Sequence, residues 1–163
     1  MLSLATLLDR TRYRLHDRSF RIDALLAALV AGITGGIPST LLALLTDDDV
    51  LRATRAAGAM LIDAHASIHE LVIAAALVHG AISLFWASVL ILTLPVQRTI
   101  AWATAASAAI AVLDLRIIAP FAFHEVAALP FWPQFADHLA WGASAGVVMT
   151  LRWRTRRVGI ARQ

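Results

Sequence analysis

The chain has 163 residues, of which 60% are hydrophobic and only 15% are charged. A soluble domain of this size needs more charge to cover its surface, so the composition favours an integral membrane protein. The absence of cysteine excludes disulfides, iron–sulfur clusters, thiolate metal sites and cysteine nucleophiles. The net charge of +3 at pH 7 does not indicate a nucleic-acid partner, because ten of the 14 basic residues lie in the two tails, beside apolar segments.

Four long apolar segments predict transmembrane helices, at residues 22–46, 71–94, 99–123 and 135–151. Each has about 17–25 residues, the length that crosses a hydrocarbon layer of about 30 Å as a helix. Isolated strands would leave their backbone groups unpaired in lipid, so helices are the only suitable structure. We therefore expect an all-α membrane protein with four transmembrane helices in a single integral domain, residues 1–163.

The arginines predict the direction of these helices. Five precede the first span, five follow the fourth, and Arg98 lies in the turn 95–98 between the second and third. The other two loops contain most of the acidic residues. The positive-inside rule then places the N-terminus, the C-terminus and the 95–98 turn in the cytoplasm. We expect the protein to be a multi-pass protein of the bacterial inner (cytoplasmic) membrane. The tail arginines are Arg10, Arg12, Arg14, Arg18, Arg21, Arg152, Arg154, Arg156, Arg157 and Arg162.

Two segments outside the spans are predicted to be short interfacial helices. Residues 2–15 place leucines at helical spacing against charged residues, which is typical of an amphipathic helix on a membrane surface. Residues 48–66 begin with aspartates suited to a helix N-terminus and continue with apolar residues. We expect one short helix there, on the outer side.

Small residues predict where helices approach closely. Gly32 and Gly36 lie four residues apart in the first span, and Gly142 and Gly146 do the same in the fourth. Such spacing favours helix packing within the bundle, or assembly into a homo-oligomer or a larger membrane complex. The 35–38 stretch, Gly-Gly-Ile-Pro, can also break or kink the first span. The lipid bilayer is the partner that the sequence predicts directly.

Ionisable residues inside the spans gather in the outer half, apart from Asp23. Such residues are costly in lipid, so each is a candidate for function. His79 and Ser83 share a face of the second span, and Asp114 lies at a similar depth in the third. We expect His79 and Asp114 to meet if the second and third spans pack as neighbours. The candidates for a proton-sensitive or ligand-binding site are His79, Ser83, Asp114, Arg116, His124, Asp137 and His138.

Three interpretations of this cluster remain open. The polar side chains can simply link helices by hydrogen bonds, or they can form a proton-responsive or solute-binding site. The third interpretation is a haem or metal held by His79 and His138, although their depths differ by roughly 8 Å. The phosphate-binding loop, the nucleophile elbow and the zincin helix are absent from the sequence. We therefore predict no catalytic residue, no metal site and no cofactor.

Residues 70–157 resemble the YagU-like family of bacterial inner-membrane proteins, whose biochemical activity is unassigned. The resemblance rests on His79-Gly-Ala-Ile-Ser83, on Pro95 and Pro120, on Leu129-Pro-Phe-Trp132, and on Asp137-His-Leu-Ala-Trp-Gly142 before an arginine-rich tail. Where the family has a Glu–Gly pair before the histidine of the fourth span, this chain has Ala136 and Asp137. The family has been associated with acid tolerance, so the resemblance implies a role linked to pH.

These observations predict a small polytopic inner-membrane protein that is not an enzyme. Its expected role is that of an accessory protein, or one related to acid or envelope stress, with a proton-sensitive polar cluster in the outer half. The alternative is a small oligomeric transporter or channel for protons or a small solute.

Overall fold

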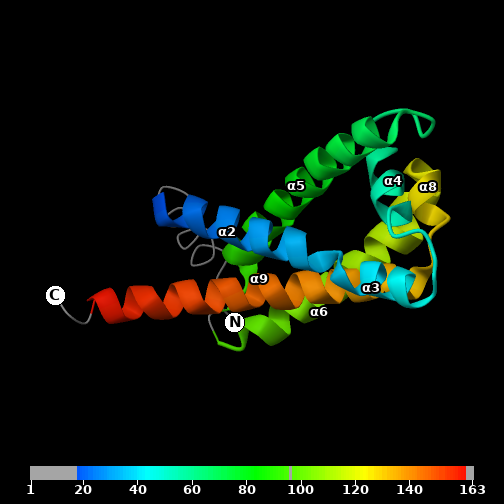
Figure 1. The fold of residues 1–163 in the computed structure, drawn as a ribbon. Helices are drawn as coiled ribbons and strands as arrows, with labels where there is room; N and C mark the ends of the chain where they lie inside the picture. The colour runs from blue at the N-terminus through cyan, green and yellow to red at the C-terminus, as the bar shows by residue number, and fades with distance from the viewer. Residues whose placement is uncertain (1–17, 96, 161–163) are drawn as a thin grey trace.

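The structure is a computed structural model that describes residues 18–95 and 97–160. Every regular element within these ranges is a helix, and Figure 1 shows their arrangement. The interfacial helix predicted at residues 2–15 lies outside the described residues. The elements are α2 (Arg18–Gly35), α3 (Ile37–Leu45), α4 (Arg52–Gly58), α5 (Ile68–Thr93), α6 (Thr99–Leu113), the π-helix η1 (Asp114–Ile118), α7 (Ala119–Ala122), α8 (His124–Ala127) and α9 (Phe131–Ile160).

Three segments are helical, long and apolar enough to cross a membrane: Arg18–Leu45, Ile68–Thr93 and Thr99–Ala122. They correspond to the first three predicted spans. Many of their large apolar side chains are exposed, among them Leu29 at 61% and Ile33 at 69%. A soluble protein rarely exposes so much contiguous apolar surface, whereas a lipid-facing surface requires it.

The fourth apolar segment belongs to a longer helix than the predicted 135–151, because α9 runs from Phe131 to Ile160. Pro133 falls within its first turn, where a missing backbone N–H costs nothing. Within the described part of the chain, α9 is not among the helices apolar enough to count as a candidate span. Polar residues such as Gln134, Asp137 and His138 lower its hydropathy.

Helix α9 nevertheless occupies the middle of the bundle. It packs against α2, α3 and α6, and Figure 1 shows it alongside α2 and α6 over much of its length. Helix α5 packs against α2 and α4 instead, and it diverges from α9 toward α4. The second and third predicted spans, α5 and α6, therefore follow each other closely in the sequence but are not each other's main packing partners. This differs from the arrangement in which His79 and Asp114 would meet directly.

Alanine and glycine allow the close approach of these helices. The buried face of α2 repeats small residues at helical spacing, Ala24, Ala27, Ala28, Ala31 and Gly35. The four alanines form one core with residues of α5, α6 and α9, namely Ala87, Leu90, Ile91, Ala103, Trp141, Ala145 and Met149. Side chains this small let the backbones come close enough for dispersion contacts to hold the bundle together.

The predicted packing glycines differ in what surrounds them. A Cβ built on Gly142 would lie 2.4 Å from the Ser107 Cβ, and one on Gly146 would lie 2.7 Å from the Ile100 Cα, so both glycines lie where α9 meets α6 most closely. Gly32 is at ordinary contact distance from Ser83, at 3.4 Å. Gly36 makes no close contact within the chain, since no atom of the described neighbours lies within 4 Å of a Cβ built there, and its role in assembly stays a prediction. Gly36 instead separates α2 from α3.

A buried ion pair joins the beginning of α2 to the last part of α9. The Nε of Arg152 donates to Oδ1 of Asp23 over 2.8 Å, and the Asp23 side chain is only 1% exposed. An unpaired carboxylate at this burial would be strongly destabilising, so Arg152 sets which part of α9 lies beside the start of α2. The sequence identifies Asp23 as an ionisable residue of the first span and Arg152 as a tail arginine, but it does not predict that they form an ion pair.

The close contact at Gly142 predicts a stability difference between two glycine substitutions. Gly142→Ala is expected to destabilise the fold by about 1–3 kcal/mol, because the new methyl group overlaps Ser107 and the Ala103 carbonyl. Gly80→Ala is the matched control, since no described neighbour lies within 4 Å of its Cβ position and alanine favours the helix. Thermal unfolding followed by circular dichroism in detergent measures both. If Gly142→Ala and the wild-type protein had the same melting temperature, the close packing of α9 on α6 at Gly142 would be contradicted.

Candidate functional site

A break in the first predicted span positions the candidate site. Helix α2 ends at Gly35 and α3 begins at Ile37, with Pro38 in its first turn. Proline has no N–H to donate and cannot continue the hydrogen bonding of a regular helix, so the break falls here. In lipid, any backbone group released by such a break must find a partner within the protein.

Two side chains from other helices supply partners at this break. The Oδ1 of Asp137, on α9, accepts the backbone N–H of Ser39 over 2.8 Å. The Nε2 of His79, on α5, is 3.0 Å from the Gly32 carbonyl oxygen. Because a carbonyl only accepts, Nε2 of His79 must carry the proton in this contact. The break in the first span thus brings a histidine and a carboxylate from two other helices to the same place.

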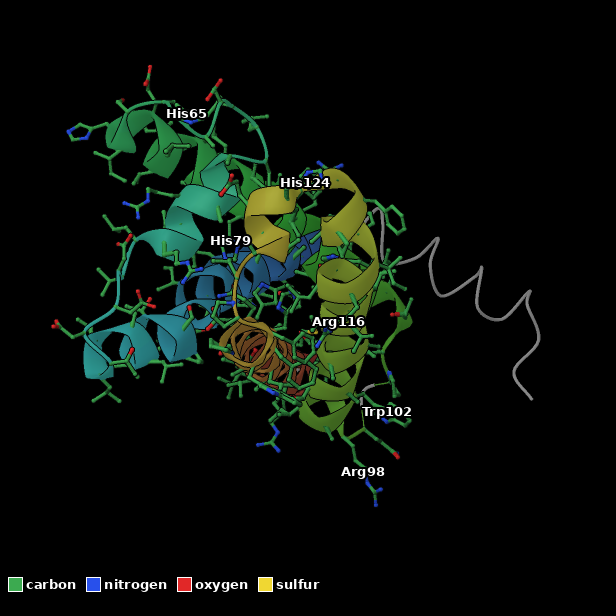
Figure 2. All side chains as sticks on the ribbon, turned by 90° about the vertical axis from the view of Figure 1, so that its right-hand side faces the viewer. His65, His79, Arg98, Trp102, Arg116 and His124 are labelled. Atoms are coloured by element: carbon green, nitrogen blue, oxygen red, sulfur yellow. The ribbon has the colours of Figure 1, made fainter. Side chains whose placement is uncertain are left out.

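A cavity of about 340 Å³ adjoins the break, and we call it the polar cavity. Its polar lining comes from α5, α6, η1 and α9. Figure 2 looks at this end of the molecule and shows His79 close to its centre, with His65 and Arg98 toward the periphery. The polar residues that line the cavity are His79, Ser83, Ser107, Asp114, Gln134, Asp137 and His138.

Most of the predicted site residues meet in this cavity. His79, Ser83, Asp114, Asp137 and His138 all line it. Arg116 and His124 do not: the Arg116 guanidinium lies 4.2 Å from the centre of the Phe131 ring, and His124 begins α8 as an exposed residue. The two-residue separation of Asp114 and Arg116 accounts for this difference, since such residues point in different directions on a helix.

The histidine of α9 is held in one orientation by its own helix. Its Nδ1 lies 2.8 Å from the backbone carbonyl oxygen of Gln134, one turn earlier, so Nδ1 carries a proton. Its Nε2 points toward Oδ2 of Asp114, at 3.6 Å. With Nδ1 protonated, a neutral His138 presents the lone pair of Nε2 to a carboxylate, and a second proton at Nε2 would turn that contact into an ion pair.

The π-helix η1 places Asp114 at the cavity wall. The backbone N–H of Ala119 donates to the Asp114 carbonyl, five residues back, which widens this turn of the third span. Pro120 follows directly, and it has no backbone N–H to donate to a carbonyl of the preceding turn. Single π turns inside α-helices are frequent at functional sites.

Sequence reasoning missed several residues that organise the cavity. The Trp141 Nε1–H donates to the Ser83 hydroxyl over 3.1 Å, and the Ser107 hydroxyl donates to the His138 carbonyl. Gln134 fixes His138 through its carbonyl, and Ser39 provides the N–H that Asp137 accepts. Gln134 could have been found from its four-residue spacing to His138. The residues of α6 and α3 required knowledge of the helix arrangement.

In residues 18–95 and 97–160, no group of three or more His, Asp or Glu side chains could hold a metal ion. Comparison with known proteins finds no family model, no curated protein and no solved structure that matches the chain. The resemblance to the YagU-like family therefore stays a prediction.

The Asp137 contact predicts a local effect of substitution at the break. Asp137→Ala should expose the Ser39 amide to faster hydrogen exchange and cost about 1–2 kcal/mol, because a partly buried donor near the start of α3 loses its acceptor. Asp137→Asn keeps an acceptor oxygen and should retain most of the protection. Hydrogen–deuterium exchange over residues 36–45 distinguishes the two variants. Unchanged exchange in Asp137→Ala would show that another group satisfies the Ser39 amide.

Proposed function

We propose that the chain is a multi-pass protein of the bacterial inner membrane with four spans and both termini in the cytoplasm. Three helices have the length and hydropathy of spans. We assign α9 as the fourth, because its 30 residues are long enough and it packs between α2 and α6, where its polar groups find partners. The distribution of arginine supports the orientation.

The natural absence of cysteine makes the topology directly testable. We expect a membrane-impermeant maleimide to label Ala64→Cys in intact spheroplasts, since residue 64 lies in an exposed loop before α5. Gln97→Cys, in the turn before α6, should be labelled only after the membrane is permeabilised. Arg154→Cys serves as a second cytoplasmic position. Labelling of Gln97→Cys in intact spheroplasts would overturn the assignment.

We infer that the polar cavity responds to protons from the outer side, and that the protein is an accessory protein and not an enzyme. The observation that carries this inference is the approach of Nε2 of His138 to Oδ2 of Asp114 at 3.6 Å, with both side chains more than a quarter exposed. Proton uptake changes a repulsive contact into an attractive one. Asp114 belongs to η1 and His138 to α9, so the change acts between two helices.

The packing of the rest of the bundle favours a sensor over an open channel. Away from the polar cavity, the described core of α2, α5, α6 and α9 is filled by Ala28, Leu90, Ala145, Met149 and their neighbours. The cavity is therefore a pocket in one half of the bundle. A proton that enters it can alter contacts between helices, which is the usual action of a histidine switch.

Protonation should change the hydrogen exchange of the helices around the cavity. Between pH 7.5 and pH 5, after correction for the intrinsic rate, we expect altered protection in residues 114–118 and 131–141 of the wild-type protein. His138→Gln and Asp114→Asn should each abolish the difference. His65→Gln, which removes an exposed histidine in the loop before α5, should retain it. A wild-type protein with identical protection at both pH values would refute the proposed response.

A small oligomeric transporter is the second candidate, and one observation favours it. His79, Ser83 and Asp114 line the cavity together, as a solute pathway would require. Because the core next to the cavity is filled by side chains of α2, α5 and α9, transport would need a rearrangement of α5 or α9. Uptake of a small solute into proteoliposomes, driven by a proton gradient, would support the transporter over the accessory protein.

A further inference from the structure

The walls of the polar cavity are mainly apolar and aromatic. Trp86, Trp141 and Phe123 contribute aromatic rings, and Ile82, Ile110 and Leu115 are among the aliphatic residues. A volume of about 340 Å³ lies at the small end of the range for pockets that hold organic molecules. Apolar walls with a few convergent polar groups are the usual composition of a ligand site.

The side chains that give the cavity a fixed charge are all acidic. Asp114 and Asp137 line it, whereas arginine does not. The nearby cations are engaged elsewhere: Arg116 lies over Phe131, and Arg52 and Arg55 of α4 pair with Asp48 and Asp49. His79 donates to Gly32, and a neutral His138 adds a lone pair, so neither supplies a fixed positive charge. At low dielectric, two carboxylates without a fixed counter-charge favour a cation strongly.

The opening of the cavity indicates how a ligand reaches it. Ile82 of α5 and Ile118 of η1 both line the cavity, and each is 38% exposed. These two elements are not extensively packed on each other, and Figure 1 shows α5 leaning away from α9 at this end. In the proposed topology, this rim faces the hydrocarbon layer, so a ligand that enters here must be compatible with lipid.

We propose that the polar cavity binds a small hydrophobic organic cation, an aromatic amine or quaternary ammonium ion. The charged group lies beside Asp114 and Asp137, and the apolar part lies against Trp86 and Trp141, whose rings also attract cations. This inference rests on the proposed site. Because a proton on His138 adds positive charge to the same space, protons and the organic cation oppose each other.

Binding of benzyltrimethylammonium to the full-length protein tests the inference. The protein is placed in phosphatidylcholine nanodiscs at pH 7.5, and empty nanodiscs give the background. Neopentylbenzene, which replaces the charged nitrogen with carbon in the same shape, serves as the neutral competitor. We expect saturable binding of the cation, no displacement by the neutral compound, and at least severalfold weaker binding at pH 5.5.

Variants assign the binding to the two carboxylates. Asp114→Asn and Asp137→Asn should each weaken binding about tenfold or more, and Glu125→Gln, on the exposed surface of α8, should leave it unchanged. Melting temperature confirms that each variant is folded. Binding no greater than that of empty nanodiscs, displacement by neopentylbenzene, or binding that survives both aspartate substitutions would overturn the proposal. Hydrogen exchange that responds to pH without the ligand would leave the proposed proton response intact in each of these cases.

Discussion

The central and least apolar of the long helices, α9, needs a partner for each polar group inside the bundle, and the rest of the structure depends on this requirement. Arg152 pairs with Asp23 of α2, and the Ser144 hydroxyl accepts a hydrogen bond from the Thr34 hydroxyl of α2 over 2.8 Å. Further along, Trp141 bonds to Ser83 of α5, and Asp137 accepts an amide of α3. These contacts fix the position of α9 along its neighbours, while Gly142 and Gly146 set its distance from α6.

The same contacts connect the break in the first span to the cavity. His79 and Asp137 both line the cavity and both bond to backbone groups at the break. Under the proposed function, a change of charge in the cavity acts on groups that hold α2 and α3 in their relative orientation. Irregular backbone at membrane depth is tolerated only where other protein groups or water satisfy it, which explains why the break and the polar cluster occur together.

Hydropathy predicted three of the helices within a few residues, because a long apolar run in lipid has only one suitable structure. The clustering of ionisable residues also predicted that His79, Asp114 and His138 belong to one site. It could not predict their contacts, since these depend on which helices are neighbours. Asp114 meets His138 because α6 and η1 lie against α9. The short connection after α5 had instead suggested that α5 and α6 are neighbours. The full length of α9 was missed because its polar residues resemble the end of a span.

The place of α9 after the other long helices in the sequence has a consequence for the order of assembly. Helices α2, α5 and α6 leave the ribosome before α9, yet the core that they share with it cannot form without it. Before α9 is present, the contact between Asp23 and Arg152 and the contact between the Ser39 amide and Asp137 are not yet made. In the proposed topology, α2 and α5 can already pack on each other in the bilayer at this stage, while α6 still lacks its main packing partner. In the proposed topology, the contacts that α9 makes therefore form after those between α2 and α5, and a chain that stops before α9 leaves exposed the polar groups that α9 covers.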